Sequence, residues 1–129
     1  MLKLDNIHTD YGNIRAVRGV SLHIEAGEMV CLIGANGAGK STTLMTISGI
    51  HRPTQGTITF EGKDITLMLP EKRVALGISQ VPEGRLIFPE MTVLENLELG
   101  AYLRKDTPII KEDLSRVFDL FPTLRDRRK

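Results

Sequence analysis

The chain has 129 residues, 41% of them hydrophobic and 26% charged, so it can bury a core and is neither fibrous nor low in complexity. Seventeen Lys and Arg against sixteen Asp and Glu leave a net charge of +1, which predicts no nucleic-acid partner. The single cysteine, Cys31, fits a reducing compartment. We find no signal peptide and no apolar run long enough to span a membrane, so we expect a cytoplasmic chain without direct membrane insertion.

The first predicted elements are two antiparallel strands. Apolar residues at Leu2, Leu4 and Ile7 begin the first strand, and residues 10–13 have turn chemistry. Residues 20–24 alternate between apolar and polar side chains, which is typical of a strand with one buried face.

Residues 29–33 are continuously apolar, which predicts a central strand buried on both faces with Cys31 as a small core hydrophobe. Residues 34–39 form a glycine-rich loop. A helix over 40–47 follows, with Gly49 as its stop signal.

The sequence pattern of the remaining residues predicts further short elements. A hairpin is expected over 57–65, a helix from Pro70 to Leu76, and a strand over 78–81. Thr92 and Glu95 form a capping box that begins a helix through Tyr102, and an amphipathic helix covers 110–121. Residues 125–129 carry no structural stop signal, so we expect the chain to be truncated.

Residues 34–41, Gly-Ala-Asn-Gly-Ala-Gly-Lys-Ser, fit the phosphate-binding P-loop pattern. The flanking strand and helix are the context that this motif requires. Glycines let successive backbone N–H groups point inward, and the helix N-terminus adds its positive dipole end. Lys40 is expected at the β- and γ-phosphates, Ser41 at Mg²⁺ and Thr42 at the α-phosphate. The alternative is a glycine-rich turn with an exposed lysine.

Along its whole length the chain resembles the ATP-binding subunits of ABC transporters. The matching landmarks, in the family's order, are residues 20–24, 27–30, 35–38, 41–44, 49–50, 53–58, 62–65 and 91–97. Residues 77–93 look most like the second ATPase subunit of branched-chain amino acid importers, and urea and amide importers share much of this pattern.

The resemblance implies a set of site residues. Tyr11 falls where an aromatic ring stacks on adenine, with Val17 beside the base. The family's glutamine loop, which contacts Mg²⁺ and senses the γ-phosphate, aligns with Glu83 here, and Gln80 stands three residues earlier. We expect Lys40 and Glu83 to serve catalysis, and Ser41, Glu83 or Gln80 to contact the metal. The residues expected to hold ATP are Tyr11, Val17, Gly34, Asn36, Gly37, Ala38, Gly39, Lys40, Ser41 and Thr42.

The implied fold is α/β, a P-loop NTPase with a RecA-like core, an N-terminal antiparallel β subdomain and the start of a helical subdomain. Residues 1–89 would form the nucleotide-binding core and β subdomain, and residues 90–129 would begin the helical subdomain. The sequence contains no Leu-Ser-Gly-Gly signature and no acidic strand followed by a catalytic glutamate. We therefore expect this chain to bind ATP and Mg²⁺ but to hydrolyse ATP poorly.

The implied partners are membrane permease subunits, a second ATPase subunit and, indirectly, a solute-binding protein. The chain would then be peripheral on the inner face of the cell membrane. Leu86, Ile87, Phe88 and Met91 are candidates for a groove that receives the permease, although ordinary core packing explains them equally well. Two other functions stay open: a switch or kinase of another P-loop family, and an ABC-type ATPase without a transport role.

Overall fold

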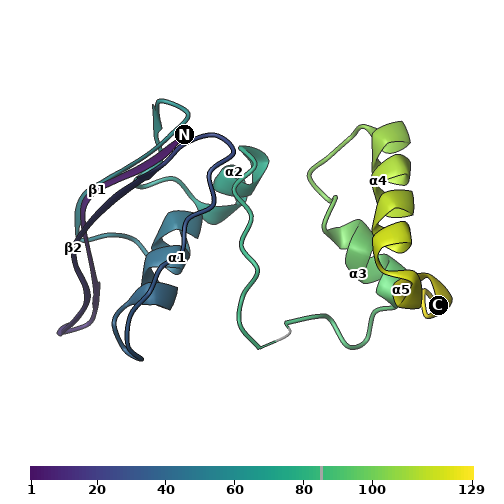
Figure 1. Cartoon of the computed structure of the whole chain (residues 1–129), viewed down its shortest axis with the longest axis horizontal. Coiled ribbons are helices and arrows are strands. Elements are labelled where there is room, and N and C mark those ends of the chain that lie inside the picture. The colour runs from purple at the N-terminus through teal and green to yellow at the C-terminus, as the bar shows by residue number, and fades with distance from the viewer. Residues whose placement is uncertain (85) are drawn as a thin grey trace. The chain divides into compact units, whose positions relative to one another are not determined.

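The computed structural model describes residues 1–84 and 86–129. These residues pack into two compact units, Met1–Val81 and Pro82–Lys129 (Figure 1). The first unit holds a β-sheet with helices α1 and α2, and the second holds helices α3, α4 and α5. The expected assignment of 1–89 and 90–129 to two subdomains stays a prediction.

The first unit is built on a four-stranded antiparallel sheet with the strand order β2-β1-β3-β4. Both predicted hairpins are confirmed, because β1 pairs with β2 and β3 pairs with β4. The second strand begins earlier than the alternation at 20–24 indicated. The strands are β1 Leu2–Tyr11, β2 Ile14–Ile24, β3 Gln55–Phe60 and β4 Lys63–Asp64.

An irregularity in β1 explains why its buried residues do not alternate evenly. Leu4 and Ile7 are both fully buried although they stand three residues apart. The pairing with β2 shifts register between them, and Asn6 adopts a positive φ of 49°. A bulge of this kind turns the next side chains back to the core face. Gly56 lies opposite, where a Cβ would come within 2.4 Å of the Asn6 carbonyl oxygen.

Helix α1 (Lys40–Ser48) confirms the predicted helix after the glycine loop, and Gly49 ends it with a φ of 85°. Its contact with the sheet includes a buried hydrogen bond of 3.1 Å between the hydroxyls of Thr46 and Thr9. The apolar core beneath this helix consists of Leu4, Ile7, Val17, Ile58 and Ile65, with Leu2, Val20, Leu22, Ile47, Phe60, Met68 and Ile78 packed against it.

Helix α2 (Pro70–Ala75) is also confirmed and carries a buried arginine. Arg73 is 1% exposed, and burial lowers the pKa of its guanidinium. The guanidinium donates to four carbonyl oxygens at 2.8–2.9 Å: those of Thr46, Ile47, Thr66 and Met68. It thereby joins the end of α1 to the segment before α2.

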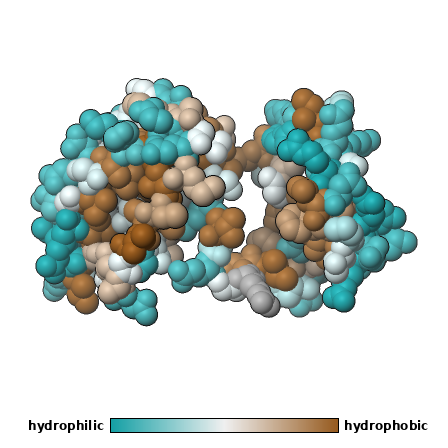
Figure 2. All heavy atoms as spheres, in the orientation of Figure 1, coloured by the Kyte–Doolittle hydropathy of each residue, from teal (hydrophilic) through white to brown (hydrophobic). Residues whose placement is uncertain are grey.

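Two predicted strands are wrong. Residues 29–33 and 78–81 form no strand, and Met29 and Ile33 are 92% and 94% exposed. Cys31 is exposed as well, not a core residue. A strand needs a neighbour for its backbone hydrogen bonds, and the sheet of the described residues contains only β1–β4. Residues 29–33 therefore run as a trace without an arrow into the loop before α1 (Figure 1). Figure 2 shows hydrophobic residues on the surface of the first unit.

The second unit contains α3 (Val93–Leu99), α4 (Thr107–Leu120) and α5 (Pro122–Asp126). The capping box of Thr92 and Glu95 is confirmed, but α3 ends before Tyr102. The amphipathic helix is confirmed as α4, with Phe118 as its buried residue, while Phe121 is 58% exposed. Helix α5 was not expected from the sequence.

Candidate phosphate-binding site

The loop before α1 ends in a backbone conformation that favours glycine. Gly37 and Gly39 have φ values of 83° and 85°, in the left-handed region. A Cβ on Gly39 would lie 2.5 Å from the carbonyl oxygen of Ala16 on β2. The loop therefore lies close against the backbone of β2 at this point.

Helix α1 begins directly at the end of this loop, with Gly39 as its N-cap residue. The carbonyl oxygen of Gly39 accepts hydrogen bonds from both the backbone N–H and the hydroxyl of Thr43, each 2.8 Å long. The positive end of the helix dipole consequently lies beside residues 34–39. Such a helix start attracts anions, phosphate groups among them.

Lys40 folds back over the loop. Its Nζ donates to the carbonyl oxygens of Gly34 and Ala35, at 2.7 and 2.8 Å. The ammonium group thus lies within the curve of the glycine loop, at the place where the motif requires a cation for phosphate. The structure brings the predicted loop residues and Lys40 together in one cradle.

Ser41 and Thr42 stand in the first turn of α1, next to the loop. Ser41 is exposed, and the carbonyl oxygen of Thr42 accepts a hydrogen bond from the Thr46 hydroxyl. Among the described residues, no group of three or more His, Cys, Asp or Glu side chains could hold a metal. Mg²⁺ needs no such cluster when phosphates supply most of its ligands, so a hydroxyl oxygen at this helix start fits the ion.

The two residues predicted to contact the base, Val17 and Tyr11, differ in their exposure to solvent. Val17 is 1% exposed and packs in the core beside Gly39, so it supports the loop from beneath. Tyr11 is 43% exposed at the end of β1, and its ladder partner Ile14 begins β2. The base contact of either residue stays a prediction.

Tyr11 has a partner that no pattern in the sequence indicated. Its hydroxyl forms a hydrogen bond of 2.7 Å with Nε2 of His51, and the two rings meet edge to face with centroids 4.7 Å apart. Forty residues separate the pair, and no local pattern connects them.

The two candidates for the glutamine position lie in different units. Oε1 of Gln80 accepts a hydrogen bond of 2.5 Å from the Ser48 hydroxyl at the last turn of α1. Ser41 stands seven residues earlier, about 10 Å along the helix axis at the usual rise per residue. The structure therefore does not bring Gln80 and Ser41 together. Glu83 belongs to the second unit and is exposed, and its role stays a prediction.

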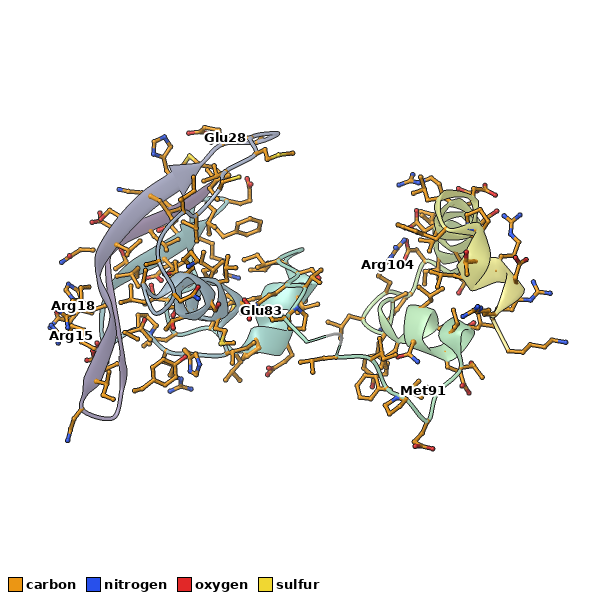
Figure 3. All side chains as sticks on the ribbon, turned by 60° about the horizontal axis from the view of Figure 1, so that its bottom comes forward. Arg15, Arg18, Glu28, Glu83, Met91 and Arg104 are labelled. Carbon is orange, nitrogen blue, oxygen red and sulfur yellow. The ribbon has the colours of Figure 1, made fainter. Side chains whose placement is uncertain are left out.

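Two arginine side chains stand on β2. Arg15 and Arg18 both belong to β2 and are labelled in Figure 3. Arg15 donates to a carboxylate oxygen of Asp10 at 3.0 Å, and this hydrogen bond is the main reason that the pKa of Asp10 is lowered.

An apolar groove of about 290 Å³ lies within the second unit. Of the four candidate groove residues, Ile87, Phe88 and Met91 line it (Met91 is labelled in Figure 3), whereas Leu86 does not and is 72% exposed. That this groove receives a permease stays a prediction. Asn96 holds the preceding loop, because its side chain bonds to the backbone of Phe88 and Met91 at 3.0–3.2 Å. The groove residues are Ile87, Phe88, Pro89, Met91, Val93, Asn96, Leu97 and Leu124.

A glycine loop that leads into a helix, with its lysine curled over the loop carbonyls, defines a P-loop nucleotide-binding protein. A model of the ABC transporter family matches residues 17–128. The chain belongs to this family.

Two curated relatives show how far the likeness extends. Over 127 residues the chain is 41% identical to the high-affinity branched-chain amino acid transport ATP-binding protein BraG of Pseudomonas aeruginosa, covering 98% of this chain and 54% of BraG. It is 39% identical to the lipopolysaccharide export system ATP-binding protein LptB of Haemophilus influenzae, over 82% of this chain and 44% of LptB. The chain thus spans about half the length of these relatives.

Solved structures of ABC transporter cassettes are similar to this chain as well. An ATP binding subunit of an ABC transporter matches with a TM-score of 0.83 and 28% identity, over 99% of this chain and 52% of that one. A dimeric ATP-binding cassette, MJ0796, in a post-hydrolysis state bound to ADP and Pi, matches with a TM-score of 0.69 and 31% identity, over 82% of this chain and 49% of that one. The predicted fold class is confirmed. No helix within the described residues is long and apolar enough to cross a membrane.

Proposed function

We propose that this chain binds ATP together with Mg²⁺ and is part of the ATPase subunit of an ABC transporter. The observation that carries the proposal is the cradle formed by residues 34–39, the start of α1 and the Lys40 ammonium group. In its present position Lys40 bonds two loop carbonyls. A bound triphosphate would supply stronger, charged acceptors for the same ammonium group.

Each cradle residue has a part in this proposal. Backbone N–H groups of residues 34–39 surround the β-phosphate, Lys40 neutralises charge on the β- and γ-phosphates, and Thr42 contacts the α-phosphate. Ser41 would supply an oxygen ligand to Mg²⁺, an ion that would offset the negative charge of the phosphates. Tyr11 stacks on the adenine ring.

Catalysis by the whole protein would use Lys40 and Glu83, with Glu83 or Gln80 contacting Mg²⁺ and sensing the γ-phosphate. The 129 residues hold no signature motif and no catalytic glutamate after an acidic strand. Phosphoryl transfer needs a positioned water and full charge neutralisation, so this chain alone should bind ATP but turn it over slowly. Hydrolysis would take place in a pair of ATPase subunits, and the dimeric MJ0796 cassette with ADP and Pi supports that arrangement.

The transported solute we propose is a branched-chain amino acid. BraG, which covers nearly the whole chain at 41% identity, is named for that solute. Relatives with other names reach 35–39% identity, among them ribose importers and the exporter ATPase LptB. Urea and amide importers are the alternatives within the importer class.

The partners we propose are membrane permease subunits, a second ATPase subunit and, through the permease, a solute-binding protein. The apolar groove of about 290 Å³ beside Phe88 and Met91 is the surface offered to the permease. The chain would then be held at the inner face of the cell membrane by protein contacts, without inserting into the bilayer. No nucleic acid is involved, in keeping with the net charge of +1.

Titration calorimetry of the chain with ATP and Mg²⁺ tests the proposal. We expect saturable binding that becomes about 10- to 100-fold weaker in Lys40→Ala, because a charge-assisted contact to phosphate is lost. Lys72→Ala is the matched control, since Lys72 is an exposed lysine on α2. A preference for GTP would contradict ATP as the ligand, and equal affinities of Lys40→Ala and the unmodified chain would contradict the proposed site.

A further inference from the structure

The contact between Tyr11 and His51 joins the expected base-binding ring to the phosphate-binding helix. The phenol oxygen and Nε2 lie 2.7 Å apart, and the ring planes meet at 76°. A rotatable hydroxyl can donate to a bare Nε2 or accept from a protonated one, so the bond persists in either tautomer of His51. His51 is half-buried, whereas Tyr11 keeps 43% of its surface exposed.

His51 is itself fixed from two sides. Its backbone N–H donates to the carbonyl oxygen of Met45, which ties it to the last turn of α1. Three residues later, Thr54 donates its backbone N–H to the His8 carbonyl at 2.8 Å and its hydroxyl to Asp10 at 3.0 Å. The segment around His51 is therefore held between the end of α1 and the end of β1.

We propose that His51 is a positioning residue that holds the ring of Tyr11 at a set place relative to the phosphate cradle. This inference rests on the proposed binding of ATP. Lys40 and the loop lie at the first turn of α1, and His51, three residues beyond the last residue of α1, bonds Tyr11. A ring held in this way is ready for a base before the nucleotide arrives.

The physical gain is preorganisation. Tyr11 stands at the end of a strand beside a turn, where an unheld side chain samples several rotamers. Ordering such a side chain on binding costs free energy, and a ring already held by His51 avoids that cost. A preordered Tyr11 ring strengthens the binding only of ligands that carry a base. The triphosphate contacts Lys40 and the loop whether or not the ring is held.

The test compares two ligands and five proteins. ATP carries a base and inorganic tripolyphosphate does not, so the ratio of their dissociation constants isolates the contribution of the base. The proteins are the unmodified chain, His51→Ala, Tyr11→Phe, the double variant and His51→Gln. Tyr11→Phe keeps the ring and removes only the hydroxyl that bonds His51.

We expect His51→Ala and Tyr11→Phe each to bind ATP about three- to tenfold more weakly, because each loses one neutral hydrogen bond. The affinity for tripolyphosphate should not change. The double variant should be no weaker than either single variant, because both changes remove the same bond. His51→Gln should recover much of the loss, since a glutamine amide can also bond the phenol.

Three results would overturn the inference while leaving the proposed function intact: unchanged ATP affinity in both single variants, additive losses in the double variant, or equal losses for ATP and tripolyphosphate. The last result would mean that His51 merely stabilises the end of α1. Failure of the unmodified chain to bind ATP would overturn the proposed function and this inference together. Tyr11→Phe keeps the test decisive even if His51→Ala unfolds.

Discussion

Arg73 occupies the space that a side chain at Gly49 would need: a Cβ on Gly49 would lie 2.8 Å from Nε of Arg73. The guanidinium cannot swing away, because it donates to four carbonyl oxygens around it. Gly49 also has a φ of 85°, which a residue with a Cβ adopts at a cost. Backbone conformation and packing therefore both require glycine at the end of α1.

We expect Gly49→Ala to lower the free energy of unfolding of the first unit by about 2–4 kcal/mol, from backbone strain and overpacking. Urea denaturation followed by circular dichroism measures the change. Gly62→Ala is the matched control, because Gly62 has a φ of 76° but no atom within 4 Å of the position that a Cβ would take. Equal losses in the two variants would mean that Arg73 makes room.

Gly39→Ala should impair the phosphate cradle more than it impairs the fold. A Cβ there would lie 2.5 Å from the Ala16 carbonyl oxygen, which belongs to the backbone of β2, so the loop itself has to move. We expect ATP affinity to fall at least about tenfold, because a displaced loop no longer aims its N–H groups at phosphate. Calorimetry measures the affinity. Undiminished binding would show that the loop adapts without loss.

Whether Glu83 or Gln80 contacts Mg²⁺ can be tested by the Mg²⁺ dependence of ATP binding. The side chain of Gln80 bonds the Ser48 hydroxyl at the last turn of α1, far from Ser41. We therefore expect Glu83→Ala to reduce the gain in ATP affinity that Mg²⁺ provides, and Gln80→Ala to leave it unchanged. ATP titrations with and without Mg²⁺ decide between them. The opposite ranking would assign the metal contact to Gln80.

The capping box of α3 should make the second unit sensitive to acid. Hydrogen bonds from the backbone N–H and hydroxyl of Thr92 lower the pKa of Glu95. A lowered pKa in the folded state stabilises the fold above the usual glutamate range, and this stabilisation is lost as pH falls through the folded pKa. The effect of Glu95→Ala should accordingly be larger at pH 7 than under acid conditions.

Thr92→Ala removes the other half of the box and should cost about 1 kcal/mol at pH 7, as is usual for a lost N-cap. Denaturation curves at neutral and acid pH measure both variants. Glu98→Ala, an exposed glutamate later in the same helix, is the control. A loss in Glu95→Ala that stays constant with pH would argue that the ionised carboxylate does not cap the helix.

Asn96 should control the rigidity of the loop beside the apolar groove. Its side-chain amide donates to the carbonyl oxygens of Phe88, Met91 and Thr92, and its Oδ1 accepts from the Phe88 N–H at 3.0 Å. We expect Asn96→Ala to speed amide hydrogen exchange at Phe88 and Met91 by at least about tenfold, because these bonds open together. Exchange that remains slow would show that apolar packing alone holds the loop.

The sequence by itself determined the local elements. Turn residues, the Thr92–Glu95 capping box and the glycine loop before α1 are short-range features whose hydrogen bonds close within a few residues, so the hairpins and helices α1 to α4 could be predicted, although α5 was not. The lysine of the phosphate loop was predictable for the same reason, because its partners Gly34 and Ala35 are near neighbours.

Only the tertiary structure decided where distant segments meet. The bond between Tyr11 and His51 crosses forty residues, and Arg73 reaches back to Thr46 at the end of α1. The apolar run at 29–33 predicted a buried strand, but apolar character describes what a segment can bury and not whether a neighbour is present to pair with it. In the described residues β1 pairs with β2 and β3 and not with that run. Pairing and packing between remote segments are therefore what the fold adds to this sequence.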